Sequence, residues 1–208
     1  MNSRVASPPS GRRMRSRRTS SSRPRKTVSR ETVFRGRLLE VRRDRIRLPD
    51  GGEATREFIV HPGAVMIVPL LHDGRLVMER QWRYPLERVM LEFPAGKLEA
   101  GEPTLACAQR ELLEETGYAA AEWALAGVLH NAIAYSNERI EIWFARGLSA
   151  GERRLDEGEF LDLELVDEAE LDRLCAAGAV TDAKTLIGLQ WLQNWRAGRW
   201  TIPGFAPR

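Results

Sequence analysis

GKLEAGEPTLACAQRELLEETGY, residues 96–118, is the stretch of the chain that says most about its fold. Pro103 suits the first turn of a helix, where its missing N–H costs little, and Gly117 suits the left-handed conformation that ends one. This interval predicts a helix over residues 103–116. At 100° per residue its apolar positions form one buried stripe, made of Leu105, Ala108 and Leu112.

Two glutamates of this helix point to a metal site. Glu111 and Glu115 are four residues apart, so they lie about 40° from each other on the face that adjoins the stripe. Like charges at this spacing destabilise a helix, and beside a buried surface they repel more strongly or bind a proton. A divalent cation removes the conflict, because Mg²⁺ binds carboxylate oxygens and retains water or phosphate as further ligands. For an RExxEE string taken alone, a solvated acidic face is the alternative.

The whole stretch follows one spacing, G-x5-E-x7-R-E-U-x-E-E-x-G-U, in which U is a bulky apolar residue. This spacing resembles the Nudix box, the signature of the Nudix hydrolases. Tyr118 takes the last bulky position. The fixed positions are filled by Gly96, Glu102, Arg110, Glu111, Leu112, Glu114, Glu115 and Gly117.

The resemblance implies a fold and a reaction. The fold class is α+β, a Nudix-type α/β/α sandwich around a mixed β-sheet, in which the box forms a loop, a helix and a second loop. The reaction is hydrolysis of a nucleoside diphosphate linked to another moiety, with Mg²⁺ as cofactor and Mn²⁺ as the alternative ion.

Roles follow by position in the box. The resemblance implies that Arg110 orients the carboxylates, that Glu115 is central to catalysis, and that Glu102 braces the loop. The implied metal ligands are the side chains of Glu111, Glu114 and Glu115 and the backbone carbonyl of Ala95.

Segments outside the box resemble the ADP-ribose pyrophosphatase and nucleotide-sugar pyrophosphatase branch of the family. They are HPGAV (61–65), QWRYP (81–85), LEFPAGKLEAGE (91–102), SNERIEIWFA (136–145) and DAKTLIGL (182–189). This resemblance implies a nucleoside diphosphate sugar as substrate, with ADP-ribose as the best single candidate. It also implies a homodimer whose subunits exchange a small N-terminal antiparallel sheet.

The branch resemblance adds further site residues. Arg83 and Glu138 match substrate-binding positions, and an arginine at a strand end is well suited to a diphosphate. In this branch a mobile acidic loop supplies the general base or an extra metal ligand. Here that loop is LDEGEFLDLE, residues 155–164, in which we assign Glu157 as the base and Glu159 as a metal ligand.

One departure leaves the preferred sugar open. Members that prefer ADP-ribose carry Ser-Pro-Gly about 15 residues past the box, where this chain has Ile133 and no proline. Two alternatives to a nucleotide-sugar hydrolase therefore remain. One is a Nudix hydrolase that acts on capped RNA, a dinucleoside polyphosphate or a nucleoside triphosphate; the other is a Nudix protein that senses nucleotides without catalysis.

Composition divides the chain into a basic tail and an acidic body. The net charge of +3 is the sum of two unlike parts. Residues 1–30 have ten basic and no acidic residues, whereas the remainder has 22 basic and 29 acidic residues. Residues 1–30 are rich in Ser, Arg and Pro, which predicts a disordered tail. A solvated segment, a contact of its arginines with nucleic acid and an organellar presequence are the alternative interpretations of this tail. We expect N-terminal antiparallel strands over 31–61, a Nudix hydrolase domain over 62–200 and a C-terminal tail over 201–208.

The secondary-structure pattern within the body is clear in places. Alternating apolar residues predict strands at 32–48 and 53–60 around a turn at 49–52, and the continuous apolar run 64–71 predicts a strand buried on both faces. Helices are expected at 167–176 and 182–196. Two cysteines, Cys107 and Cys175, suit a reducing compartment and a cytoplasmic location. No apolar run is long enough to cross a membrane.

Overall fold

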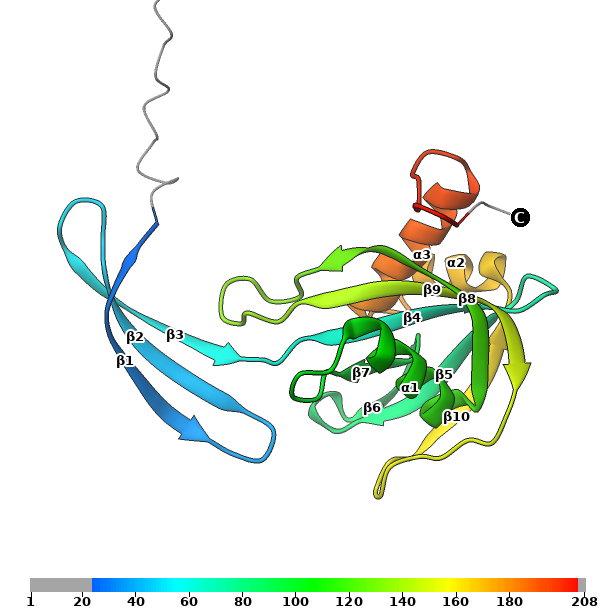
Figure 1. Ribbon diagram of the computed structural model, residues 1–208, viewed down its shortest axis with the longest axis horizontal. Coiled ribbons are helices and arrows are strands. Elements are labelled where there is room, and N and C mark those ends of the chain that lie inside the picture. Colours follow the sequence, from blue (N-terminus) through cyan, green and yellow to red (C-terminus); the bar gives the residue numbers. More distant parts are fainter. Residues whose placement is uncertain (1–23, 206–208) are drawn as a thin grey trace, which may run out of the picture.

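The computed structural model describes residues 24–205, which form two β-sheets and three α-helices (Figure 1). The smaller sheet is antiparallel, with the strand order β1-β2-β3. Its strands are β1 (Lys26–Arg35), β2 (Glu40–Arg47) and β3 (Glu53–Val60). The predicted hairpin is confirmed between β2 and β3, whereas the expected strand over 32–48 is interrupted by a turn at 36–39.

The first strand begins at Lys26, inside the segment that we expected to be a disordered tail. Residues 26–35 pair with β2, in a register that joins Lys26 to Arg47 and Arg35 to Glu40. Ladder hydrogen bonds therefore order a sequence whose side chains have little to bury. The rest of the predicted tail, residues 1–23, lies outside the described residues.

The larger sheet is mixed and has the order β10-β5-β4-β9-β8, with β6 paired to β5 and β7 paired to β4. Its central pair, β4 and β9, is parallel. The strands are β4 (Ala64–Leu70), β5 (Leu76–Arg83), β6 (Arg88–Glu92), β7 (Ala95–Lys97), β8 (Tyr118–Leu129), β9 (Ile140–Ala150) and β10 (Leu161–Val166). A short 3₁₀ helix, η2 (Tyr84–Leu86), joins β5 to β6.

Helices cover both faces of this sheet, as the Nudix resemblance implies. The helices are α1 (Thr104–Thr116), α2 (Glu168–Ala176) and α3 (Ala183–Arg196). All seven residues of β4 are buried, and they alternate between the two faces because successive side chains of a strand point in opposite directions. Val65 and Ile67 pack with α1, whereas Met66 and Val68 belong to the core that α2 and α3 close. None of the helices in residues 24–205 is long and apolar enough to span a membrane.

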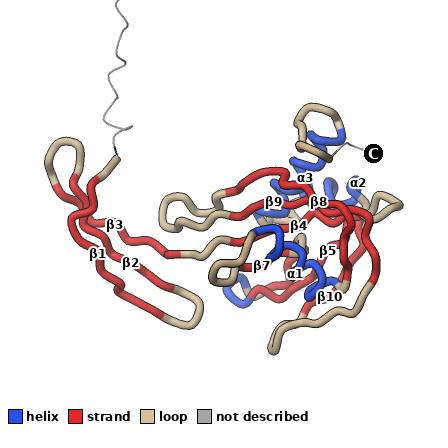
Figure 2. Tube along the Cα trace, viewed as in Figure 1, coloured by secondary structure: helices blue, strands red, loops and turns tan. Residues whose placement is uncertain are grey.

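The small sheet stands to one side of the sandwich (Figure 2). Leu38 and Leu39, in the loop between β1 and β2, line the same cleft as residues of the sandwich, and β3 is hydrogen-bonded to the loop between β8 and β9. The N–H of Ile59 in β3 donates to the carbonyl of Tyr135, in the loop between β8 and β9, at 2.8 Å. At the other end of the chain, the segment expected as a C-terminal tail packs on the core: Ile202 and Phe205 are buried, and the Trp195 indole N–H donates to the Phe205 carbonyl at 2.9 Å.

Candidate active site

Helix α1 and the short strand β7 bring the box glutamates together. Glu115 is 4% exposed, and its Oε2 accepts a hydrogen bond from the N–H of Ala95 at 3.0 Å. At the next residue, Gly96, an added β-carbon would lie 1.8 Å from the carboxyl carbon of Glu111. The strand therefore approaches the helix so closely that only glycine fits. Gly117 ends the helix in the left-handed conformation, with φ of 73°, as predicted.

Arg110 holds three carboxylates at once. Its Nε and Nη2 donate to the two oxygens of Glu102 at 2.9 and 3.0 Å, while Nη1 donates to Glu111 at 2.8 Å and to Glu114 at 3.0 Å. The hydrogen bonds from Arg110 lower the pKa of Glu102 to about 2. This fork fixes the side-chain conformations along one side of the helix, since a planar guanidinium binds carboxylates in defined directions.

Strand β5 supplies the opposite side of the site. Glu79, Gln81 and Arg83 are two residues apart, so they share the face that turns toward the cleft, and the residues between them, Arg80 and Trp82, are exposed. The end of this strand is braced from β6 and α3.

The brace is the carboxylate of Glu92, which is buried. Arg83 donates to it twice, through Nε at 2.6 Å and Nη2 at 2.8 Å, and Lys184 of α3 contacts it as well. Lys184 also donates to Asp182, the residue that caps α3. These ion pairs lower the pKa of Glu92 although burial opposes the shift, so two cations are held in place beside the cleft.

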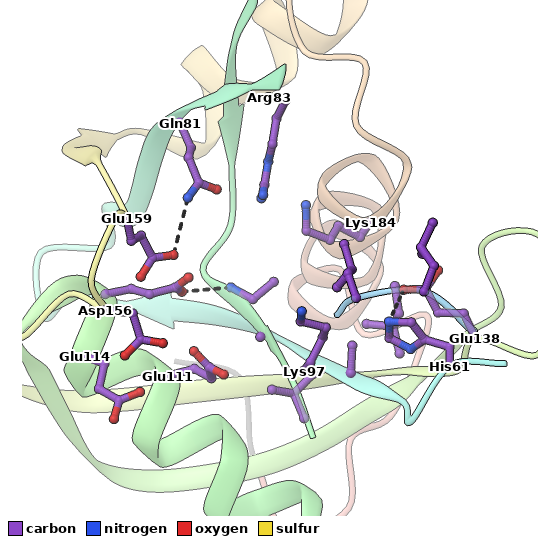
Figure 3. A pocket seen from close by; sticks show the side chains of 18 residues that line it. His61, Gln81, Arg83, Lys97, Glu111, Glu114, Glu138, Asp156, Glu159 and Lys184 are labelled. Atoms are coloured by element: carbon purple, nitrogen blue, oxygen red, sulfur yellow. Dashed lines mark hydrogen bonds and ion pairs between the residues drawn. The ribbon is translucent and has the colours of Figure 1, made fainter. Parts of the chain in front are cut away.

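These elements enclose a cleft of about 530 Å³. Figure 3 shows Glu111, Glu114, Asp156 and Glu159 on one side of it, with Arg83 and Lys184 across from them. The acidic side is lined by Glu111, Glu114, Glu115, Asp156 and Glu159, and the remaining charged lining residues are His61, Arg83, Lys97, Glu138 and Lys184. A negatively charged ligand that binds together with a cation would match these two sides, because the cation would face the carboxylates and the ligand would face Arg83 and Lys184.

Burial makes two of the carboxyl groups weak acids. Desolvation raises the pKa of Glu115 to about 10, and the charges of Glu79, Glu111 and Glu159 add to the shift. Desolvation also raises the pKa of Glu79 to about 8, with Glu92 acting in the same direction. Neutral carboxyl groups at physiological pH are the expected state of a crowded acidic site without a cation.

The residues fit a hard divalent cation, although in residues 24–205 no three acidic, histidine or cysteine side chains already converge closely enough to hold one. Glu111 and Glu114 are turned toward Arg110 instead. The donor set is carboxylate oxygens, which Mg²⁺ and Mn²⁺ prefer. The close approach at Gly96 places the Glu111 carboxylate beside the main chain that follows Ala95.

Comparison with known proteins identifies the family. The NUDIX domain model matches residues 60–189, and the model of the nucleoside diphosphate sugar hydrolase N-terminal domain matches residues 26–59. The chain belongs to the Nudix family. The two matches meet at the last residue of β3, close to where the small sheet joins the sandwich. Nudix hydrolases in general use divalent metals.

Individual relatives cover most of the chain. It is 37% identical over 170 residues to an ADP-ribose pyrophosphatase of Bacillus subtilis, across 81% of this chain and 92% of the relative. It is 38% identical over 172 residues to a methanol dehydrogenase activator of Bacillus methanolicus, with the same two coverages. A crystal structure of an ADP compounds hydrolase superposes with a TM-score of 0.76 at 27% identity, covering 86% of this chain and 98% of the other.

The structure brings most of the predicted Nudix site residues to one cleft. Arg83, Glu138 and Glu159 line it together with Ala95, Glu111, Glu114 and Glu115, whereas Glu102 and Arg110 do not line it. Glu138 lies next to His61, 3.6 Å from its Nε2, and Glu159 accepts from Gln81 at 3.3 Å. Glu157 differs, because it is exposed and does not line the cleft, whereas its neighbour Asp156 does.

The acidic loop is shorter than expected. We predicted a loop over 155–164, but residues 161–166 form strand β10, which pairs with β5 from Leu161–Gln81 to Val166–Leu76. The alternation in LDLELV is a strand signal, which the density of acidic residues obscured. The short strands β6 and β7 were likewise not predicted.

Sequence reasoning missed three charged residues of the site, namely Glu79, Glu92 and Lys184. Glu92 and Lys184 stand inside segments that carry the branch resemblance, at 91–102 and 182–189, but no role was assigned to them. Glu79 had a weaker signal. It begins an E-x-Q-x-R alternation that puts three polar side chains on one face of a strand.

Proposed function

We propose that this protein hydrolyses the diphosphate bond of a nucleoside diphosphate sugar, with Mg²⁺ as cofactor and ADP-ribose as the first substrate to test. Hydrolysis of ADP-ribose would give AMP and ribose 5-phosphate. The observation that carries the proposal is the division of one cleft into a carboxylate side and a cationic side. The match of residues 26–59 to the N-terminal domain of nucleoside diphosphate sugar hydrolases supports the substrate class.

The chain's own residues have separate tasks in this proposal. Glu111, Glu114, Glu115 and the Ala95 carbonyl would hold the cation, and Glu159 would approach it from the acidic loop. When bound, Mg²⁺ supplies positive charge that stabilises the charge developing on the diphosphate. Arg110 keeps the carboxylates oriented, and this matters because small displacements of positioned groups lower the rate of reaction.

The cationic side would bind the diphosphate. The Arg83 guanidinium, already oriented by Glu92, offers planar donors that suit phosphate oxygens, and Lys184 adds a point charge. Glu138, beside His61, would contact the sugar half of the substrate. Glu157 is assigned as the general base that accepts a proton from the attacking water.

A homodimer is part of the proposal, because the small sheet has little core of its own. In β1–β3 only Asp44 and Ile46 are buried, and a three-stranded sheet of this kind needs a further apolar surface. The sandwich presents one on β5 and its continuation, where Trp82 is 56% and Tyr84 is 83% exposed. Light scattering of the purified chain would report twice the monomer mass if the proposal is right and the monomer mass if it is wrong.

A cytoplasmic location is also proposed, supported by the two free cysteines, Cys107 and Cys175.

A substrate panel tests the proposed reaction against the alternatives. ADP-ribose, GDP-mannose, a dinucleoside polyphosphate, a nucleoside triphosphate and capped RNA would be incubated with Mg²⁺ or EDTA, and products identified by ³¹P NMR. We expect EDTA-sensitive cleavage of a nucleotide sugar to two phosphomonoesters. Cleavage of capped RNA or triphosphates alone would favour the other enzymatic reading, and no turnover of any compound would favour a nucleotide sensor.

A further inference from the structure

Glu79 is a fully buried carboxyl group for which the described part of the chain provides no partner. Its side chain is 0% exposed, and neither Oε1 nor Oε2 has a hydrogen-bond partner in residues 24–205. Burial of a polar group without a hydrogen-bond partner is unfavourable, because the group loses its hydrogen bonds to water and gains none in return. A leucine at this place in β5 would carry no such cost, so the carboxyl group requires a reason.

The neighbours of Glu79 in β5 place it close to the cleft, although Glu79 itself is fully buried and does not line the cleft. It shares one face of β5 with Gln81 and Arg83, and both of these residues line the cleft. Across the sheet it is directly opposite Glu92 in β6. Glu115 is a further acidic neighbour, and among the charges around Glu115 that of Glu79 raises its pKa the most.

The two cations nearest to Glu79 are already engaged. Arg83 and Lys184 both bind Glu92, so neither forms an ion pair with Glu79. An ionised Glu79 would therefore lie beside two other carboxyl groups with no bound counter-charge. A protonated Glu79 would have a hydroxyl donor with no acceptor. Neither form is satisfied by the described residues alone, which indicates that the chain is built around a species bound at this position.

We propose that Glu79 is an additional carboxylate of the divalent-cation site, contributed by strand β5 beside the cleft. The inference rests on the proposed function, because it assumes that the cleft holds Mg²⁺ or Mn²⁺. It adds a ligand from outside the box, on a different strand, to the set that the box supplies. Glu79 and Glu115 would both help to hold the cation, whose charge would compensate both carboxylates, and this would account for an acidic residue at a core position.

Direct measurement of metal binding tests this role without relying on turnover. Metal-free wild-type protein, Glu79→Gln and Glu164→Gln would be titrated with Mn²⁺, and free Mn²⁺ followed by electron paramagnetic resonance. Glu164→Gln is a matched control because this substitution also removes one acid from the sheet. Glu164 lies on β10, where it pairs with Arg80 on the outer face. We expect E79Q to lose one bound ion per chain or to bind Mn²⁺ at least tenfold more weakly, while E164Q binds as wild type does.

A second variant ensures that the test of Glu79 does not depend on the Glu79→Gln substitution alone. Glu79→Leu replaces the carboxyl group by a side chain that needs no partner, and we expect the metal-free melting temperature of E79L to equal or exceed that of wild type, with the same loss of Mn²⁺ binding. Wild-type binding of Mn²⁺ by both Glu79 variants would overturn the inference and leave a buried water or a proton shared with Glu115 as the partner. Absence of Mn²⁺ binding by wild type would instead overturn the proposed metal dependence.

Discussion

Gly96 and Glu111 are in such close contact that a single methyl group cannot be placed between them. A β-carbon on Gly96 would lie 1.8 Å from Cδ of Glu111 and 1.9 Å from its Oε1. The carboxylate of α1 is thus pressed against the main chain of β7, one residue after the Ala95 carbonyl. Because the two proposed metal ligands come from different elements, the glycine determines how near to each other they can be.

Substitution of Gly96 by alanine therefore tests the geometry of the acidic side. The methyl group must displace Glu111, and we expect turnover to fall by about 10²-fold, the order of loss that a displacement of about 1 Å causes in a positioned site. Gly52→Ala, in the exposed turn between β2 and β3, is the control for adding a methyl group. Near-normal turnover by folded G96A would show that the position of Glu111 is unimportant.

Arg83 should act on substrate binding. Arg83→Ala removes the guanidinium held by Glu92, and we expect KM to rise at least tenfold because a charge-assisted contact with phosphate is lost. Arg80→Ala is a matched control, since Arg80 lies three residues earlier and pairs with Glu164 on the outer face. Steady-state kinetics would reveal the difference. Equal KM values for R83A and R80A would remove Arg83 from the substrate site.

The two acids of the loop can be assigned separately. If Glu157 is the general base, Glu157→Gln lowers kcat by 10² to 10⁴-fold and leaves Mn²⁺ affinity unchanged, since general-base catalysis contributes about that much. If Glu159 binds metal, Glu159→Gln weakens Mn²⁺ binding. Glu159 lines the cleft and Glu157 does not. An unchanged kcat in E157Q would show that Glu157 is not the general base and that another group has this role.

The metal-free protein should lose stability as the pH rises. The pKa values of Glu115, about 10, and Glu79, about 8, exceed the ordinary value of 4.5. The folded state therefore binds more protons than the unfolded state between pH 4.5 and these values, and the free energy of unfolding falls with pH across that window. Carboxylates with a lowered pKa, such as Glu102, change the pH dependence of stability only below pH 4.5.

Thermal melts at pH 5.5 and pH 8 would measure this effect. We expect a lower melting temperature at pH 8 without metal, and a larger stabilisation by Mg²⁺ at pH 8 than at pH 5.5, because the cation competes with the protons. The Glu79→Leu variant should flatten the metal-free dependence. A melting temperature that rises from pH 5.5 to pH 8 without metal would contradict the assignment.

How far the sequence predicted the structure depended on whether the signal was local. The box helix, its glycine end and the fully buried strand β4 follow from spacing within about 20 residues, and each is present. Strand β10 and the brace at Glu92 depend on partners far along the chain, at Gln81 and Lys184. The alternation in β10 is a local strand signal, but local spacing does not show which distant residues become the partners of β10 or of Glu92.

The same limit applies to the site. Glu111, Glu114 and Glu115 could be assigned from the box, and Arg83 from its strand end, but the isolation of Glu79 is a property of packing. An acidic residue in a strand is usually exposed, whereas Glu79 is fully buried in a strand that is paired with β6 on one side and β10 on the other.

The central claim is that the box carboxylates and a divalent cation together hydrolyse a nucleotide sugar, and one comparison tests it most directly. Phosphatase-labile phosphate released from ADP-ribose would be measured for wild type with Mg²⁺, wild type with EDTA, and Glu115→Gln with Mg²⁺. We predict turnover only in the first sample, with E115Q reduced at least 10²-fold and still folded by circular dichroism. Turnover that persists in EDTA, or in folded E115Q at a near-normal rate, would contradict it.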